Sequence, residues 1–181
     1  MKERDSGAGS PGAKSVAVPL RISVIGAGEA SPEECRLAEA VGRRLAELGA
    51  IVITGGLGGV MEAASRGCSQ AGGISIGVLP GRNTQEANPW LTIPLATAMG
   101  ESRNALVVRA GEAVVAIGGS WGTLSEIALA RKMGHPVVLL GEPPVELPLP
   151  RAERWEEAAA WALQQAELRR QGRSATSREE E

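Results

Sequence analysis

Three segments of the chain share one pattern, in which a short apolar run ends in a glycine-rich turn and a helical segment follows. The three turns lie at residues 26–28, 55–59 and 118–123. Apolar runs that alternate with helices in this way build βαβ units around a parallel sheet. The pattern therefore predicts an α/β protein, a three-layer sandwich with a central parallel sheet.

Hydrophobic periodicity and end signals place the other elements. Residues 50–56 form a β-branched run that is typical of a central parallel strand, buried on both faces. Ser31, Pro32 and Glu34 supply an N-cap, a first-turn proline and a capping-box partner for the first helix, which Gly49 ends. Further strands are expected at 74–80, 91–97, 112–119 and 135–141, and further helices at 57–73, 101–111, 122–134 and 151–171.

One ligand-binding domain is expected at residues 21–171. Tails at 1–20 and 172–181 are expected to be disordered because they are polar and poor in apolar residues. The final helix could pack on the sheet or on a second subunit. The long polar loop at 81–90 resembles loops that cover ligands.

The composition excludes several classes of function. The net charge is −2, and the chain has no Phe and no Tyr, so it offers neither a basic field nor a Phe/Tyr stacking platform for nucleic acid. One His and two Cys without CxxC spacing cannot form a His/Cys metal cluster, so no metal site is expected. No segment has the apolar length of a membrane span or signal peptide, which favours a cytoplasmic protein without a membrane partner. A small molecule is the expected partner.

The three glycine-rich turns predict a phosphate-binding rim. In a parallel sheet they all lie at the carboxyl edge, where helix N-termini present free amides and partial positive charge. Glycine can also serve a tight turn for conformational reasons alone, which is nearly the better interpretation of the first turn. That turn lacks the third glycine of the dinucleotide fingerprint, so NAD is disfavoured, and neither of the other two turns has a P-loop lysine. The residues predicted to bind phosphate are Gly26, Gly28, Gly55, Gly56, Gly58, Gly59, Gly119, Ser120, Gly122 and Thr123.

Two charged residues could serve the same edge. Arg103 lies near the start of its expected helix, where a guanidinium could grip phosphate, although it could also be a solvated helix residue. Glu126 lies three residues after Thr123, so it could be the second member of a capping box instead of a functional acid. Glu62 is interpreted as a first-turn acid and His135 as a turn or cap residue.

Two tryptophans could stack on a planar ligand. Trp90 closes the 81–90 loop, and Trp121 lies inside the third turn. A role in the core or in an interface is at least as well supported by their positions. Both are therefore kept as candidate stacking residues.

The segments TGGLGGVMEAASRG, SRN and GGSWGTLSEIALA, in this order and at these separations, resemble the Lonely Guy superfamily, and especially its branch containing molybdenum cofactor carrier proteins. The resemblance covers about residues 21–141. It implies a Rossmann-like fold, a homodimer or higher homo-oligomer, and a nucleotide-type phosphate held by the glycine turns.

The resemblance also bears on activity. Members that act as cytokinin-activating phosphoribohydrolases cleave the N-glycosidic bond of a nucleoside 5′-monophosphate, and their signature pairs Met-His-x-Arg-Lys with Pro-Gly-Gly-x-Gly-Thr-x-x-Glu. This chain reads GESRN at 100–104 and GGSWGTLSE at 118–126, so it keeps Arg103 and Glu126 but lacks the His and the Lys. The carrier branch is similar in keeping the glycine turns without the hydrolase segment.

The resemblance thus implies a binding or carrier protein for a phosphate-bearing planar ligand. That ligand would be the molybdenum cofactor or a nucleotide, and no other cofactor is required. The alternative is a nucleoside 5′-monophosphate phosphoribohydrolase, in which Arg103 and Glu126 would be catalytic.

Overall fold

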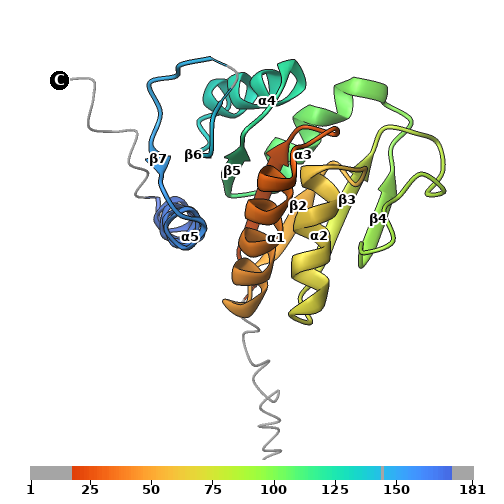
Figure 1. Ribbon diagram of the computed structural model, residues 1–181, viewed down its shortest axis with the longest axis horizontal. Helices are drawn as coiled ribbons and strands as arrows, with labels where there is room; N and C mark the ends of the chain where they lie inside the picture. The colour runs from red at the N-terminus through yellow and green to blue at the C-terminus, as the bar shows by residue number, and fades with distance from the viewer. Residues whose placement is uncertain (1–17, 144, 173–181) are drawn as a thin grey trace, which may run out of the picture.

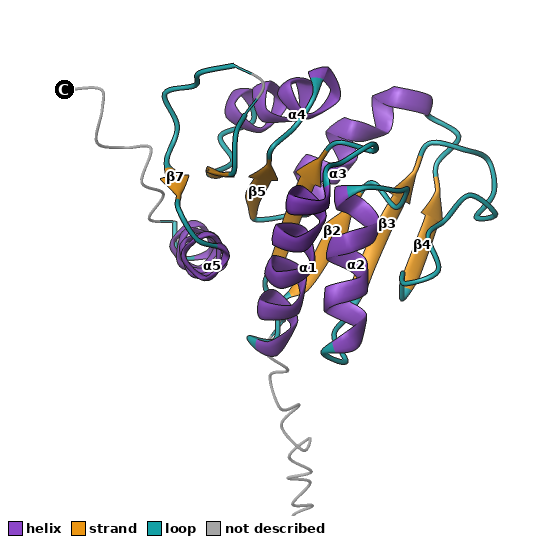
Figure 2. Cartoon of the chain, in the orientation of Figure 1, coloured by secondary structure: helices purple, strands orange, loops and turns teal. Residues whose placement is uncertain are grey.

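The computed structural model describes residues 18–143 and 145–172, so the predicted tails lie mostly outside the described residues. Seven strands form one sheet in the order β4-β3-β2-β1-β5-β6-β7, and every neighbouring pair is parallel. Helices α1, α2 and α5 pack on one face of the sheet and α3 and α4 on the other (Figures 1 and 2). The predicted α/β sandwich with a central parallel sheet is confirmed.

The elements follow the predicted order, with one strand that the sequence pattern did not indicate. The strands are β1 Arg21–Gly26, β2 Ile51–Thr54, β3 Ser75–Leu79, β4 Ile93–Ala96, β5 Ala113–Ile117, β6 Val137–Leu140 and β7 Arg151–Ala152. The helices are α1 Pro32–Glu47, α2 Val60–Gln70, the 3-10 turn η1 Gly100–Arg103, α3 Asn104–Ala110, α4 Trp121–Lys132 and α5 Trp155–Arg170.

The first helix begins as its local sequence predicts. The Ser31 hydroxyl accepts a hydrogen bond from the Glu34 amide at 3.2 Å, and the Glu34 carboxylate accepts one from the Ser31 amide at 2.7 Å. This capping box satisfies two amides that have no partner inside the helix. Gly49 follows the helix with a φ of +77°, a conformation that glycine adopts without steric cost.

The sheet separates two aliphatic cores. Alternate residues of each central strand point to opposite faces, so Val24 and Val115 pack against α1, α2 and α5, whereas Ile25 and Val114 pack against α3 and α4. All four are almost completely buried. A chain without Phe or Tyr thus fills both layers with branched aliphatic side chains and alanine.

Helices α1 and α2 pack with their backbones in close contact. A Cβ atom at Gly42 would lie 2.1 Å from the carbonyl oxygen of Ala64, and one at Gly67 would lie 1.9 Å from that of Glu39. Neither distance is compatible with a side chain, so these two glycines are required by the approach of the helices. The helices carry the first two glycine turns at their N-terminal ends.

The C-terminal segment differs from the prediction in two respects. Residues 151–152 form β7, which pairs with β6, so the last helix begins at Trp155 and not at 151. Of the two packing surfaces considered for this helix, the structure places it on the sheet: Ala158, Ala159 and Ala162 are fully buried in the core beside α1. The strand was missed because it consists of only two residues, too few to show an apolar or alternating pattern.

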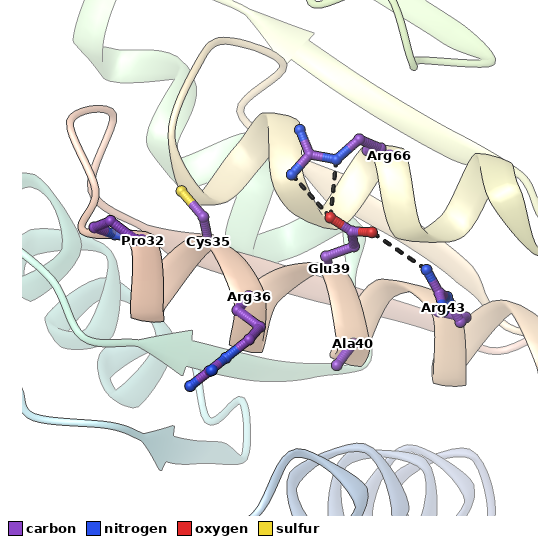
Figure 3. Close-up of a pocket in the computed structure, with 7 residues that line it drawn as sticks. All are labelled: Pro32, Cys35, Arg36, Glu39, Ala40, Arg43 and Arg66. Atoms are coloured by element: carbon purple, nitrogen blue, oxygen red, sulfur yellow. Dashed lines mark hydrogen bonds and ion pairs between the residues drawn. The ribbon is translucent and has the colours of Figure 1, made fainter.

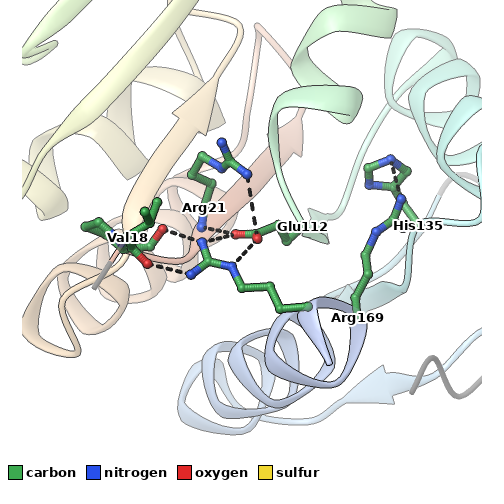
Figure 4. Close-up of polar contacts among 7 residues, drawn as sticks. Val18, Arg21, Glu112, His135 and Arg169 are labelled. Atoms are coloured by element: carbon green, nitrogen blue, oxygen red, sulfur yellow. Dashed lines mark hydrogen bonds and ion pairs between the residues drawn. The ribbon is translucent and has the colours of Figure 1, made fainter. Parts of the chain in front are cut away.

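Glu112 ties the last helix to the first strand (Figure 4). Its carboxylate accepts hydrogen bonds from the Arg21 amide at 2.9 Å and from Nη2 of Arg170 at 2.8 Å, and Arg170 also donates to the carbonyl oxygens of Val18 and Pro19. Burial raises the pKa of Glu112, but the hydrogen bonds from Arg170 and the Arg21 amide outweigh it, so the pKa is lowered. The carboxylate therefore remains charged and fully paired.

His135 lies in the turn between α4 and β6, as the sequence predicts. Its amide donates to the carbonyl oxygen of Ala130, and Nη2 of Arg169 is 3.3 Å from its Nε2 atom. Burial, together with the charges of Arg169 and Arg109, lowers the pKa of His135 to about 4. The ring is therefore neutral near pH 7, and it lies at the amino edge of the sheet, opposite the glycine turns.

None of the helices in the described ranges combines the length and the apolar character needed to cross a membrane.

We expect Glu112→Gln to lower the free energy of unfolding by about 2 kcal/mol, because it weakens charge-assisted hydrogen bonds to a buried group. Glu142→Gln is the matched control, since Glu142 pairs with Arg151 through a side chain that is 92% exposed. Its effect should be below about 0.5 kcal/mol. Urea unfolding at pH 7 measures both, and equal effects would refute the role of Glu112.

Candidate functional site

The three glycine turns meet at one cleft. Strands β2, β1 and β5 are neighbours in the sheet, so their carboxyl ends lie side by side and the turns that follow them surround a hollow of about 210 Å³. The cleft is lined by apolar, glycine and charged residues from these turns and from the η1–α3 segment. They are Ile25, Gly26, Gly28, Gly55, Leu57, Met61, Glu101, Arg103, Asn104, Ser120, Gly122, Thr123 and Glu126.

The structure divides the predicted phosphate-binding residues into two groups. Those that line the cleft come from all three turns and include the start of α4. They are Gly26, Gly28, Gly55, Ser120, Gly122 and Thr123. The residues outside the cleft are Gly56, Gly58, Gly59 and Gly119.

Two of the glycines outside the cleft, Gly56 and Gly59, have packing reasons. Gly59 has a φ of +62°, and a Cβ atom there would lie 2.3 Å from the carbonyl oxygen of Ala27. Gly56 has a φ of +77° and lies against Leu79 and Gly77 of β3. At these two positions glycine is required by the backbone conformation and by close packing. The backbone there contacts other parts of the protein and not the cleft.

Arg103 lies under the second turn and is 6% exposed. Its Nη1 atom donates to Oδ1 of Asn104 at 2.7 Å, and the guanidinium lies so close to Gly55 that a Cβ atom there would be 2.6 Å from Nη1. Its Nε atom is buried without a hydrogen-bond partner in the part of the chain that the structure describes. Burial lowers the pKa of Arg103, against the opposing attraction of Glu126 and Glu101. The alternative interpretation of Arg103 as a solvated helix residue is therefore wrong.

Glu126 also faces the cleft and is 7% exposed. The capping box proposed for it does not form, because α4 begins at Trp121 and its N-cap is Ser120, whose amide is 3.3 Å from Oγ1 of Thr123. Glu126 instead lies more than one turn into the helix. Burial raises the pKa of Glu126 to about 7, although the charge of Arg103 opposes the shift.

The structure adds Asn104, Met61 and Glu101 to the site. Asn104 is 9% exposed and receives the hydrogen bond from Arg103, so it orients the guanidinium. The sequence feature that could have identified Asn104 as a site residue is its position beside Arg103 in the SRN segment. Met61 and Glu101 reach the cleft only through the packing of α2 and η1 on the turns, which no local pattern reveals.

The two candidate stacking residues have different surroundings. Trp121 is 80% exposed at the start of α4, between the cleft residues Ser120 and Gly122. Trp90 does not line the cleft; its carbonyl oxygen accepts a hydrogen bond from Ser75, at the amino end of β3. Stacking of Trp90 on a ligand in this cleft is therefore not supported by its position.

The 81–90 loop is attached to the second turn through Asn88. Its side-chain amide donates to the carbonyl oxygen of Leu57 at 3.1 Å, and its backbone amide donates to that of Gly56 at 3.0 Å. Residues 82–86 are exposed, whereas Asn88 is buried. The loop therefore runs beside the second turn and does not cover the cleft.

A second hollow, on the outer surface of α1 and α2, has paired charges (Figure 3). Glu39 accepts hydrogen bonds from Arg66 at 2.9 Å and from Arg43 at 3.2 Å, and Cys35 lies at one end. It is remote from the glycine turns. Across residues 18–143 and 145–172, no three His, Cys, Asp or Glu side chains are grouped closely enough to hold a metal ion.

Comparisons with known proteins found a matching family and a relative that aligns with most of this chain. The SLOG cluster4 family matches residues 19–171. An uncharacterized protein of Archaeoglobus fulgidus is 43% identical over 145 residues, which cover 80% of this chain and 95% of that protein.

Two solved structures are similar over nearly their whole length. The molybdenum cofactor binding protein of Rippkaea orientalis has a TM-score of 0.76 and 33% identity, covering 82% of this chain and 98% of the other. The molybdenum cofactor carrier protein of Chlamydomonas reinhardtii has a TM-score of 0.74 and 33% identity, covering 81% and 98%. These matches confirm the predicted relationship to the carrier branch of the Lonely Guy superfamily.

We expect Glu126→Gln to make the protein more stable than the wild type at pH 8 but not at pH 4. The raised pKa means that the unfolded state loses its proton from about pH 4.5 upward, whereas the folded state keeps it until about pH 7. Wild-type stability is therefore lost between these pH values, by up to about 3 kcal/mol, and the variant avoids the loss. Urea unfolding at both pH values measures the difference, and a pH-independent difference would contradict the burial of an ionisable Glu126.

Proposed function

Because this chain belongs to the SLOG cluster4 family, we propose that it binds and carries a phosphate-bearing planar ligand in the cleft formed by the three glycine turns. The molybdenum cofactor is the first candidate and a nucleotide the second. The observation that carries the proposal is the buried guanidinium of Arg103, held beneath Gly55 at the edge where the turns meet. The two similar structures are a molybdenum cofactor binding protein and a molybdenum cofactor carrier protein, which supports the first candidate.

The phosphate would be held by backbone and guanidinium together. Gly122 lies in the first turn of α4, where amides have no partner inside the helix and the helix dipole favours an anion. Gly28 leaves room for a phosphate to approach the backbone closely, whereas the space beside Gly55 is filled by Met61 and Arg103. Arg103 supplies a full positive charge at the same place, in surroundings that exclude much of the water.

Glu126 is compatible with an anionic ligand because of its raised pKa. With a pKa of about 7, a large part of its carboxyl population is protonated near neutral pH. A neutral carboxyl does not repel phosphate, and its proton can be donated to a ligand oxygen or ring nitrogen. The acid would therefore help to orient the ligand beside Arg103.

The size of the cleft indicates how the ligand would lie. A hollow of about 210 Å³ is below the range of roughly 300–1,000 Å³ that is typical of sites enclosing a whole small molecule. The phosphate end would enter the cleft, and the planar end would extend over the rim, where the indole of Trp121 is exposed for stacking.

One observation favours a second candidate, the phosphoribohydrolase. A buried glutamate with a raised pKa beside an arginine could place or activate water at a glycosidic bond. Asn104 occupies the position that the Lys has in the hydrolase segment. Its side-chain oxygen accepts a hydrogen bond from Arg103, so one N–H group of the guanidinium is not free to bind a ligand. We therefore favour a carrier over a phosphoribohydrolase.

The ligand that copurifies decides between the candidates. We expect native mass spectrometry of protein coexpressed with a molybdopterin pathway under molybdate to reveal a bound pterin species, with molybdenum by metal analysis. Incubation with AMP should yield no ribose 5-phosphate. Turnover of AMP that disappears in Glu126→Gln would replace the carrier proposal with the hydrolase, and a bound nucleotide without turnover would select the second ligand.

Substitutions of two cleft glycines test where the ligand binds. A Cβ atom at Gly28 would meet only Met61 at 3.7 Å, and one at Gly122 would meet only Ser120 at 3.9 Å, so Gly28→Ala and Gly122→Ala should fold. Each should weaken binding of the copurified ligand by about tenfold or more, because a side chain blocks the phosphate. Gly81→Ala is the control, since its Cβ atom has comparable room but lies outside the cleft. Equal affinities for all three variants in isothermal titration would refute this site.

A further inference from the structure

The third glycine turn already contacts an anionic side chain of the protein itself, the carboxylate of Glu34. Gly118 and Gly119 have φ values of +51° and +132°, both in the region that favours glycine. These conformations turn the backbone sharply between β5 and α4, so successive amides point in different directions. At this turn the Gly119 amide donates to Oε1 of Glu34 at 3.3 Å.

The carboxylate of Glu34 is held between two segments that are 85 residues apart in the sequence. Its Oε2 atom accepts a hydrogen bond from the Ser31 amide at 2.7 Å, while Oε1 faces the third turn. A Cβ atom at Gly118 would lie 1.9 Å from Oε1, so the carboxylate lies directly on the glycine backbone. Burial raises the pKa of Glu34, but hydrogen bonds from Ser31 and from the Gly119 amide outweigh it and lower the pKa, so the group remains charged.

The amides of Gly118, Gly119 and Ser120 all have partners within the protein. The Gly118 amide donates to the carbonyl oxygen of Leu140 at 2.9 Å, and the Ser120 amide lies 3.3 Å from Oγ1 of Thr123. With the Gly119 amide bound to Glu34, a ligand phosphate finds none of these three donors free. Of the residues in this turn, Ser120, Gly122 and Thr123 line the cleft, and Gly122 lies in the first turn of α4.

We propose that Glu34 is the resident anion of the third glycine turn, and that it limits the cleft to one ligand phosphate and disfavours a diphosphate. This inference rests on the proposed function. A first phosphate would lie between Gly28 and Gly122, near Arg103. A second phosphate extending past Ser120 would approach the carboxylate of Glu34, which is hydrogen-bonded to the amide of the neighbouring residue, Gly119. Glu34 acts through Gly119 and Ser120, so it is a positioning and specificity-determining residue.

The test compares inorganic phosphate with pyrophosphate as probes. We would titrate each into ¹⁵N-labelled full-length protein and follow the amide signals of Gly28, Gly55, Gly119 and Gly122 by NMR. Glu34→Gln keeps an oxygen for the Gly119 amide and removes the charge. Glu33→Gln is the matched control, because it removes a charge from the same helical turn at a side chain that is 57% exposed and pairs with Arg36.

We expect the ratio of pyrophosphate to phosphate affinity to rise about fivefold in Glu34→Gln and to stay at the wild-type value in Glu33→Gln, because repulsion of a nearby like charge is removed. In the wild type, phosphate should shift the Gly122 signal and leave that of Gly119 in place. The Gly119 signal should follow the titration of Glu34 with pH and lose this dependence in Glu34→Gln, which reports the contact without any ligand.

Two results would overturn the inference, and they are distinguishable. If the probes shift Gly28 and Gly122 but the affinity ratio is the same in both variants, Glu34 has no part in selection although the phosphate site stands. If neither probe shifts the cleft amides in any variant while the Gly119 signal still titrates, the proposed phosphate site fails and the inference fails with it.

Discussion

The close approach of the first two strand–turn–helix units is the constraint on which the site depends. Gly42 and Gly67 let α1 and α2 pack backbone to backbone, and Gly59 lets the start of α2 lie against the first turn. The Val60 amide then donates to the carbonyl oxygen of Ala27 at 3.0 Å, which joins the second unit directly to the first turn. Two turns that are separate in the sequence thereby become adjacent walls of one cleft. Larger side chains at these positions would separate the helices and open the cleft.

The second requirement is the burial of opposite charges in an aliphatic protein. Arg103 and Glu126 are each less than a tenth exposed, and burial shifts the pKa of both toward the neutral form. Burying ionisable groups costs free energy, and groups with such shifts are concentrated at functional sites. Here the shifts leave a site that holds a positive guanidinium beside a carboxyl that is partly protonated at neutral pH. That combination suits the binding of an anion better than a permanent ion pair would.

The glycine turns contribute to this site less uniformly than their composition suggests. The chain itself uses many of their polar groups: Ala27 receives the first amide of α2, Glu34 takes the Gly119 amide, and Thr123 faces the Ser120 amide. The cleft is consequently left with few donors, at defined positions around Arg103. The proposed preference for a ligand with a single phosphate rests on this small number of donors.

The sequence by itself determined the order of strands and helices, the parallel sheet, the aliphatic core and the edge at which the glycine turns meet. The capping box of Ser31 and Glu34 was also predictable, because both partners lie within one helical turn. The similar pattern at Thr123 and Glu126 was misleading, since packing starts α4 at Trp121 and turns Glu126 inward. Only the tertiary structure decided which amides are free, that Arg103 is buried, and that Glu34 reaches the third turn. These features depend on contacts with residues that are tens of positions away in the sequence, and such contacts cannot be predicted from the local pattern of side chains.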